Sequence, residues 1–432
     1  MMRLCAAMPL LLLVACATSR APLQAPAASP RGPAVVAASA VVSPAIARGI
    51  ARADSLVAAS IGRLTPGAVL LVSRNGVLLH DTAFGYAQLE DFEAHRLASP
   101  PPMSTSTMFD LASVTKVMGT TMGVMLLVDQ GKLDLDAPVY RYLPDFRDAH
   151  KDSITVRHLL SHSAGLVQWQ PTYYHASNER EAYAVIRDMP LQWGVGAGRH
   201  YSDFSFMLLG YILERLSGQR LDVFLDSAIY KPLRLDSTTF VPKQHGFTKF
   251  ATTEQGNVYE RHMVYDSTFG YRYLGDPTAW DGWRRYVLNG EVDDGNSFYA
   301  HGGVAGHAGL FSTAGQLRVL LDMLVSSGAS APRLLSADVI HRFLTRDRYD
   351  NYLGWMRPAA LPEGSFNHTG FTGTYVLGVP KYGLSIILLT NRQNMGTDAR
   401  GYFPNVGPLQ DAVAKAIVDG AARDEAQPQA HR

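Results

Sequence analysis

A serine and a lysine three residues apart, Ser113 and Lys116, are the side chains of this sequence best suited to chemistry. They precede residues 117–128, which are apolar on nearly every side and therefore predict a buried helix. Ser113 and Lys116 would then lie one helical turn apart on the same face. Burial and the positive end of the helix dipole both favour a neutral lysine, which can accept the proton of a serine hydroxyl. The pair predicts a serine nucleophile with a lysine base, although a serine here could also be a helix N-cap.

A second polar segment, Tyr201-Ser202-Asp203, stands directly before residues 204–216, which predict another helix. Ser202 or Asp203 could simply cap that helix. Capping does not explain Tyr201. A tyrosine beside a lysine ammonium would have a lowered pKa and could relay a proton.

A third segment, His368-Thr369-Gly370-Phe371, opens the last predicted hairpin of the chain. Glycine at positions 370 and 373 permits a close backbone approach at a strand edge. Such an edge can offer a backbone N–H to a developing oxyanion. The same residues would also be ordinary at the entry of a strand.

The elements that must position these segments follow from local patterns. Strands are predicted at 68–73 and 77–81, joined through Asn75-Gly76, and again at 373–379 and 384–391. Helices are predicted at 45–61, 156–160, 179–188, 204–216, 221–229, 314–326 and 411–418. Strands at both ends of a helix-rich middle predict one α+β lobe, split in sequence, with a helical lobe inserted.

Composition restricts the class of protein further. The chain has 432 residues, of which 47% are hydrophobic and 18% charged, enough for a large core. Its net charge of +1 gives no strong field, so we expect no nucleic-acid partner. The only cysteines are Cys5 and Cys16, so the folded body has no disulfide, cysteine nucleophile or thiolate metal site.

The N-terminus reads as a targeting segment. Arg3 precedes a short apolar run at 8–15 that is too short to span a bilayer. The run ends in Leu-Val-Ala-Cys at 13–16, which resembles a bacterial lipoprotein signal in which Cys16 becomes lipidated. An ordinary secretory signal cleaved nearby is the alternative. We therefore expect a signal peptide at 1–16, an Ala/Pro-rich linker at 17–43 and the folded domain at 44–422.

Other residues that could suggest a different chemistry are better explained by packing. His158 and His162 are four apart, but no glutamate lies between them and residues 163–165 end the helix, so we expect no metal site. His301 and His307 border a glycine-rich stretch at 302–309 and are expected to pack in a loop, with a pocket position as the alternative. The aromatic stretch 259–286 is expected in the core or in a packed loop, with a share of it walling the cleft.

Taken in order, the three motifs resemble those of the serine β-lactamase and penicillin-binding-protein superfamily. The closest likeness is to class C β-lactamases, D-amino-acid peptidases of that type and family VIII esterases. Residues 154–166 and 302–313 also look like segments typical of these proteins, and the resemblance covers about residues 45–420. It implies a β-lactamase/transpeptidase-like α+β fold, with an antiparallel sheet flanked by helices and an inserted helical lobe.

The resemblance implies that Ser113 is the acylated nucleophile, Lys116 its base and Tyr201 the group that shares proton transfer. The backbone N–H groups of Ser113 and Phe371 would form the oxyanion hole.

The resemblance also implies a substrate-binding set: Asp203, His368, Thr369, Gly370 and Phe371. Two of these depart from the family pattern. Asp203 stands where asparagine is usual and could stabilise a charged Lys116. His368 stands where lysine is usual, and a partly charged histidine would hold a substrate carboxylate in a pH-dependent way.

We therefore expect an exported serine hydrolase that cleaves an ester or an amide through an acyl-enzyme, without a cofactor. Esterase, D-amino-acid peptidase and β-lactamase remain open, and a non-catalytic or slowly acylating penicillin sensor is the alternative outside the enzyme class. The expected substrate is a small molecule or peptide, and the expected location is the bacterial cell envelope, with a lipid anchor and a monomeric state.

Overall fold

The structure, a computed structural model, describes residues 42–271, 273–326 and 334–426. The expected signal peptide, Cys16 and nearly all of the expected linker lie outside these residues. The described residues all belong to one compact unit. Within the described ranges, no helix combines the length and the apolar character that crossing a bilayer requires.

A five-stranded antiparallel sheet joins the two ends of the chain. Its strands are ordered β2-β1-β8-β7-β6, so the N-terminal hairpin pairs with the last strand. Their bounds are β1 Gly67–Arg74, β2 Val77–Gly85, β6 Phe366–Thr369, β7 Tyr375–Val379 and β8 Leu384–Thr390. The turn between β1 and β2 has positive φ at both Asn75 and Gly76, the backbone that this sequence pair favours.

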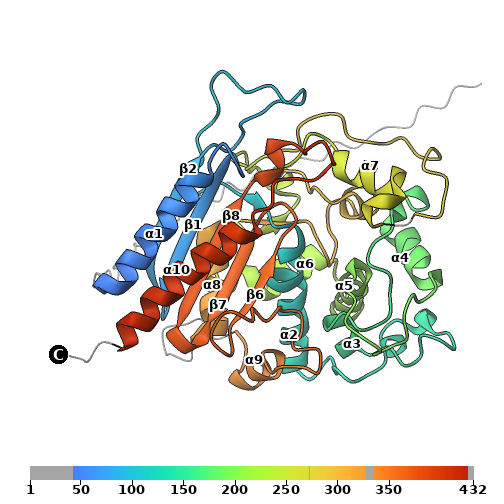
Figure 1. Cartoon of the computed structure of the whole chain (residues 1–432). Coiled ribbons are helices and arrows are strands. Elements are labelled where there is room, and N and C mark those ends of the chain that lie inside the picture. The colour runs from blue at the N-terminus through green and yellow to red at the C-terminus, as the bar shows by residue number, and fades with distance from the viewer. Residues whose placement is uncertain (1–41, 272, 327–333, 427–432) are drawn as a thin grey trace, which may run out of the picture. The chain divides into compact units, whose positions relative to one another are not determined.

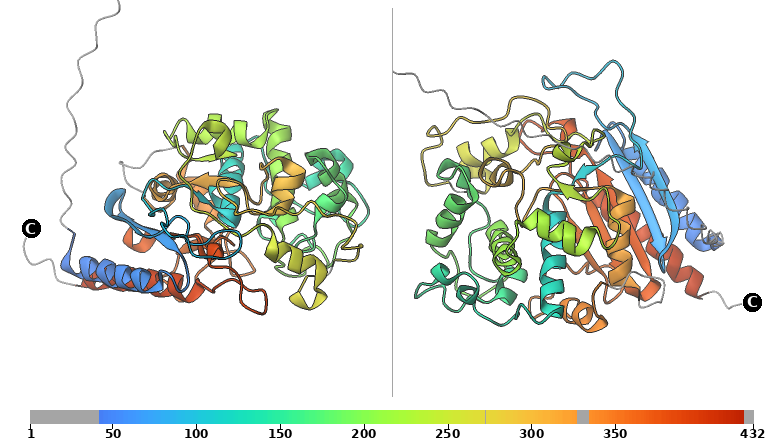
Figure 2. Two further views of the ribbon diagram at one scale, coloured as in Figure 1. Left: turned by 90° about the horizontal axis from the view of Figure 1, so that it is seen from above. Right: turned by 180° about the vertical axis from the view of Figure 1, so that it is seen from behind.

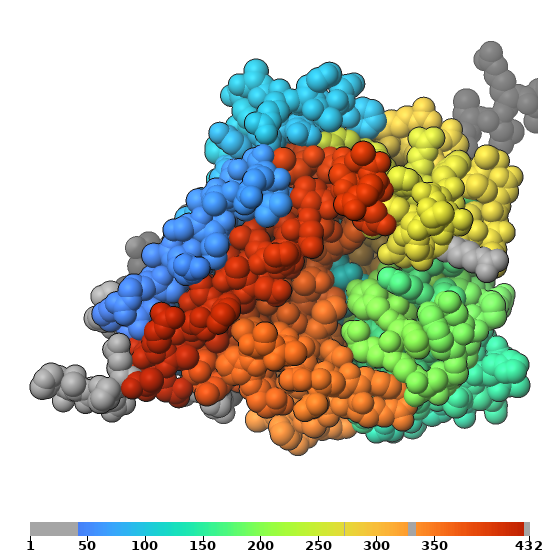
Figure 3. All heavy atoms as spheres, in the orientation of Figure 1, coloured from blue at the N-terminus to red at the C-terminus, as the bar shows by residue number. Residues whose placement is uncertain are grey.

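The sheet is covered on both faces because its central strands are apolar throughout. In β1, Ala68, Leu70 and Val72 pack toward α1 (Pro44–Ser60) and α10 (Gly407–Ala426). These two helices lie side by side on one face, as Figures 1 to 3 show. Val69 and Leu71 point into the main core, where α8 (Ala314–Val325) packs on the sheet.

The helical part of the molecule comes from the chain between β2 and β6 (Figure 1). Its α-helices, besides α8, are α2 Thr121–Asp129, α3 Val156–Leu160, α4 Glu179–Asp188, α5 Asp203–Ser217, α6 Leu221–Leu225, α7 Val258–Tyr265 and α9 Ala337–Phe343. The predicted α+β architecture with a helical insertion is therefore confirmed.

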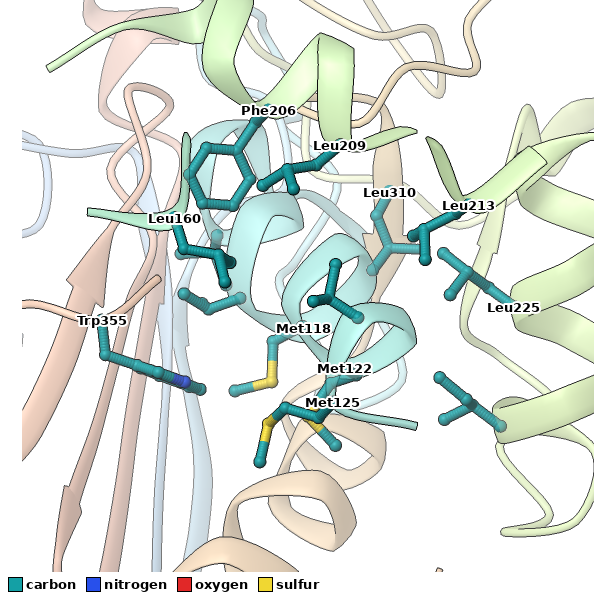
Figure 4. Packing of buried hydrophobic residues seen from close by; sticks show 14 of the residues in the cluster. Met118, Met122, Met125, Leu160, Phe206, Leu209, Leu213, Leu225, Leu310 and Trp355 are labelled. Carbon is teal, nitrogen blue, oxygen red and sulfur yellow. The ribbon is translucent and has the colours of Figure 1, made fainter. Parts of the chain in front are cut away.

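The helix that follows Ser113 is buried on all sides, as its apolar sequence predicts. A wider π-type turn at Lys116–Thr120 runs directly into α2. Figure 4 shows Met118, Met122 and Met125 on this helix, with Phe206 and Leu209 of α5 packed against it. Because every face of the helix is packed, the helix gives Ser113 and Lys116 a rigid support.

The structure corrects the sequence-based elements in several places, and α7 and α9 are helices that were not predicted. Residues 366–369 form a separate strand, β6, rather than the start of the next one. A small three-stranded sheet, β3-β5-β4, was not predicted: β3 is Phe109–Asp110, β4 Thr239–Phe240 and β5 Leu310–Ser312. The last helix is also longer than predicted, since α10 begins at Gly407 and ends at Ala426.

Candidate active site

Ser113 lies in a short 3-10 turn, Ala112–Val114, between strand β3 and the helix that contains Lys116. Its hydroxyl makes no capping bond, so the N-cap alternative is wrong. Ala112 has a φ of 46°, a left-handed conformation that residues with a Cβ rarely adopt. Its N–H donates to Asp110 Oδ1 at 2.9 Å, which holds the turn in this shape. Strain of this kind directly before a serine is typical of a functional position.

Lys116 is fully buried and is surrounded by three acceptors. Its Nζ lies 3.0 Å from Ser113 Oγ, 3.0 Å from the carbonyl oxygen of His307 and 2.7 Å from Asp203 Oδ1. An ammonium group has three N–H donors, and each finds one acceptor here. The structure thus brings Ser113, Lys116 and Asp203 into direct contact.

The expected neutral state of Lys116 is wrong for the resting protein. Burial acts to lower its pKa, but the Asp203 carboxylate and Tyr201 together raise the pKa above its usual value. The expected low pKa of Tyr201 is also wrong. Burial raises the pKa of Tyr201, and the opposite effects of Lys116 and Ser113 do not overcome it. The resting site therefore holds an ammonium and a neutral phenol.

Tyr201 is held over the site by a histidine. His162 Nδ1 accepts the backbone N–H of Ser202 at 3.1 Å, and its ring lies 4.4 Å from the ring of Tyr201. The ring of Tyr201 in turn lies 5.1 Å from Lys116 Nζ. His158 instead bonds Thr155 at the start of α3. Both histidines have structural partners, in line with the interpretation of the sequence.

Strand β6 meets the Ser113 turn at Gly370. A Cβ at this position would clash with the hydroxyl of Thr374 and with the carbonyl oxygen of Leu111, so only glycine allows the approach. Thr374 Oγ1 also donates to that carbonyl oxygen at 2.9 Å. These contacts bring Gly370 and Phe371 beside the Ser113 turn, where the oxyanion hole is predicted.

His368 does not stand in the cleft as predicted. Its side chain is 1% exposed, and its Nδ1 donates to the carbonyl oxygen of Thr369 at 2.8 Å. Burial, together with the charge of Lys116, lowers the pKa of His368 to about 3. The expectation of a partly charged histidine near neutrality is therefore wrong, and a buried neutral ring cannot attract a substrate carboxylate by charge.

A cleft of about 580 Å³ opens over Ser113. Its lining includes Ser113, Tyr201, Asp203, Thr369, Gly370 and Phe371, so six of the eight predicted site residues border one cavity. In Figure 3 a hollow lies where the yellow, green and orange-red parts of the chain meet, with teal atoms at its floor. Lys116 lies beneath this lining.

The cleft also has residues that the sequence did not single out for it. They are Gln168, Trp169, Arg199, Glu254, Glu260, Met263, Asp293, Asp294 and Arg392. His307, expected to pack in a loop, lines the cleft as well and contacts Asp294 through its Nε2 at 2.9 Å. Of the aromatic stretch, Tyr259 and Tyr271 line the cleft, as the sequence allowed.

The aromatic residues behind this wall form their own packed cluster. Trp169, Tyr173 and Trp283 are buried there, with Tyr273 and Trp280 packed against them. No local pattern marks which members of an aromatic stretch face a cavity, because that depends on how its loop folds back. The cluster supports the wall of the cleft that contains Tyr271.

Comparisons with known proteins identify the class. Residues 53–407 match the family described as Beta-lactamase, and the chain belongs to this family of serine hydrolases. It is 33% identical over 386 residues to "N-acetylmuramyl-L-alanine amidase" of Bacillus subtilis (strain 168), covering 82% of this chain and 83% of the relative. It is 30% identical over 388 residues to "Putative D-alanyl-D-alanine carboxypeptidase" of Escherichia coli (strain K12), covering 82% of this chain and 85% of that relative. Among solved structures it resembles a penicillin-binding protein homologue from Caulobacter crescentus, with a TM-score of 0.62 and 20% identity over 87% of this chain and 97% of that chain.

Proposed function

We propose that this protein hydrolyses an amide bond in a D-alanyl-D-alanine type of peptide through an acyl-enzyme on Ser113. The observation that carries the proposal is the 3.0 Å contact between Ser113 Oγ and the buried Nζ of Lys116, at the floor of the cleft. The names of the curated relatives, an amidase and a carboxypeptidase, favour an amide over an ester.

Because Lys116 is charged at rest, it must lose a proton before it can act as a base. Lys116 passes one proton to Asp203, whose Oδ1 is 2.7 Å away, and becomes a base. Ser113 Oγ then bonds to the substrate carbonyl carbon while Lys116 takes the hydroxyl proton. The backbone N–H groups of Ser113 and Phe371 stabilise the oxyanion.

The C–N bond then breaks, and Lys116 gives its proton through Tyr201 to the leaving amine. In the second half of the reaction, Lys116 takes a proton from water, and the resulting hydroxide attacks the acyl carbon of the acyl-enzyme. The bond to Ser113 breaks, Ser113 recovers its proton from Lys116, and Asp203 returns its own.

A panel of three compounds tests the substrate class: Nα-acetyl-L-Lys-D-Ala-D-Ala, a short-chain p-nitrophenyl ester and a chromogenic cephalosporin. Steady-state release of D-alanine, many times per site, is expected. Turnover of the ester alone would contradict the proposal. Covalent labelling that stops after one acyl group per Ser113 would instead support the sensor alternative.

We expect Asp203→Asn to lower kcat/KM near neutral pH and to move its acidic limb toward higher pH. In the proposed mechanism Asp203 accepts the proton of Lys116, whereas an asparagine cannot, so Lys116 must lose that proton to water before it can act as a base. The measurement is a pH profile of ester hydrolysis, with Asp145→Asn, an exposed acid, as the control. An unchanged acidic limb would show that the lysine pair does not set the active protonation state.

We also propose that the protein is exported and anchored through a lipidated Cys16, on the basis of its N-terminal sequence. Two or more acyl chains are needed for stable anchoring. The full chain expressed in a bacterium should therefore sediment with membranes, and Cys16→Ser should release it. Wild-type protein found unmodified in the soluble fraction would contradict the anchor.

A further inference from the structure

One wall of the cleft is made of four carboxylates: Glu254, Glu260, Asp293 and Asp294. Glu260 belongs to α7, Glu254 to the loop before it, and the two aspartates to a segment later in the chain. We refer to these four residues as the carboxylate wall. They border the same cavity as Ser113, and the proposed mechanism uses none of them.

Two oxygens of the carboxylate wall are buried and have no partner. Glu254 is 2% exposed, and its Oε2 makes no hydrogen bond. Asp293 is 7% exposed; its Oδ2 accepts from Gln393 Nε2 at 2.9 Å, but its Oδ1 has no partner. Neither residue forms an ion pair with any of the described residues. A buried carboxylate oxygen without a donor is costly unless a ligand supplies the donor.

The basic residues nearest to the wall are already engaged elsewhere. Arg284 donates to Asn257 Oδ1, to the carbonyl oxygen of Val292 and to that of Asp293, all neutral acceptors. Arg392 donates to the carbonyl oxygens of Phe371 and Pro404. Neither arginine reaches the two oxygens with a hydrogen bond, so both oxygens remain without a donor.

Without a cation, the carboxylates of the wall disfavour their own ionised forms. Burial first, and then the neighbouring carboxylates, raise the pKa of Glu254 and of Glu260 well above the usual range. A cation placed between them would reverse both effects, because it favours the ionised carboxylates. Asp294 already has a hydrogen-bond partner in His307, whose Nε2 lies 2.9 Å from its Oδ1.

Geometry favours an ammonium group over a metal ion. A metal ion needs several ligand atoms that converge on one point. Among residues 42–271, 273–326 and 334–426, the one group of three side chains close enough to do so is Asp91, Glu93 and His95, away from the cleft lining. A primary ammonium needs only separate acceptors for its three N–H donors.

We propose that the carboxylate wall binds a primary ammonium group on the acyl part of the substrate, with Glu254 Oε2 and Asp293 Oδ1 as acceptors. The proposal rests on the proposed function, because it assigns the substrate that reaches Ser113 a positive charge. The class of substrate is thus an acyl donor with a free amine, such as a peptide with an unblocked diamino-acid side chain.

Two matched pairs of substrates test this proposal on the intact protein. The first pair is Nα-acetyl-L-Lys-D-Ala-D-Ala and its Nα,Nε-diacetyl form. The second is the p-nitrophenyl ester of ε-aminocaproate and its N-acetylated form. Within each pair, an uncharged acetamide replaces the ammonium group and the rest of the molecule is the same. Wild-type kcat/KM should be roughly 10- to 100-fold higher for the free amine in each pair that is turned over, the size expected for charge-assisted hydrogen bonds.

Variants of the same shape but without the charge test whether the carboxylate wall causes the preference for the free amine. Glu254→Gln and Asp293→Asn should each remove most of the preference for the free amine, measured as the ratio of kcat/KM within each pair. Asp322→Asn is the control: Asp322 is also buried, but it bonds Ser73 and Ser385 and does not line the cleft. It should retain the preference.

The outcomes separate this proposal from the proposed function. If the ester pair shows the preference but neither peptide is cleaved, the peptide function fails and the ammonium site stands. If the peptides are cleaved with equal kcat/KM, the ammonium site fails and the peptide function stands. Equal use of free and acetylated substrates by the wild type overturns the site even if both variants fail to fold. Equal losses on both members of a pair in the variants would show a structural role only.

Discussion

Ser113→Ala is expected to reduce turnover by roughly 10⁵- to 10⁶-fold, the order of magnitude seen when a serine hydrolase loses its nucleophile. The variant should also lose covalent labelling by a fluorophosphonate or a labelled penicillin, because no oxygen remains to form the acyl bond. The fold should survive, since the side chain caps no helix and its loss removes one hydrogen bond, worth about 1 kcal/mol.

Ser202→Ala is the matched control for this experiment. Ser202 lies between Tyr201 and Asp203, but its hydroxyl donates to the carbonyl oxygen of Val167 and does not line the cleft. Labelling should persist in this variant. Mass spectrometry that located the label of the wild type on any other serine would overturn the assignment of Ser113.

Lys116→Met is expected to lower kcat by roughly 10²- to 10⁴-fold, the usual range for loss of a general base. Tyr201→Phe should have an effect of similar size, and the two combined should cost less than the product, because the residues act as a unit. Steady-state hydrolysis of a nitrophenyl ester measures all three variants. Near wild-type turnover in Lys116→Met would contradict the mechanism.

The stability of the lysine variant needs its own control, because Lys116→Met leaves Asp203 without its ion-pair partner. Breaking a buried pair costs about 3–5 kcal/mol. The double variant Lys116→Met/Asp203→Asn removes both charges and should recover most of that stability without recovering activity. Lys151→Met provides a further comparison, since Lys151 is also buried but its Nζ contacts the carbonyl oxygen of Arg187 and Asp148 rather than Ser113.

The sequence predicted elements whose signals are local. Helix α4 begins and ends at the predicted residues, and the turn at Asn75 and Gly76 has the expected backbone. The small sheet was missed because β3 and β4 have two residues each, too few to show a period of two. Strand β6 was merged with its neighbour, since four residues before a glycine carry little information of their own.

The contact between Ser113 and Lys116 was likewise predictable, because the two residues are three positions apart and this spacing allows their 3.0 Å contact. The carboxylate wall could not be predicted, because nothing in the separate segments around 254–260 and 293–294 indicates that they meet. Their convergence depends on how α7 and the later loop fold against the cleft.

The sequence by itself therefore predicted which residues could carry the chemistry and most of the elements that hold them. Only the tertiary structure decided their charge. Asp203, distant in sequence, lies 2.7 Å from Lys116 and keeps it an ammonium, while burial keeps His368 neutral. The physical reason is that a pKa depends on solvation and on the distance to other charges, and both are set by residues far apart in the chain.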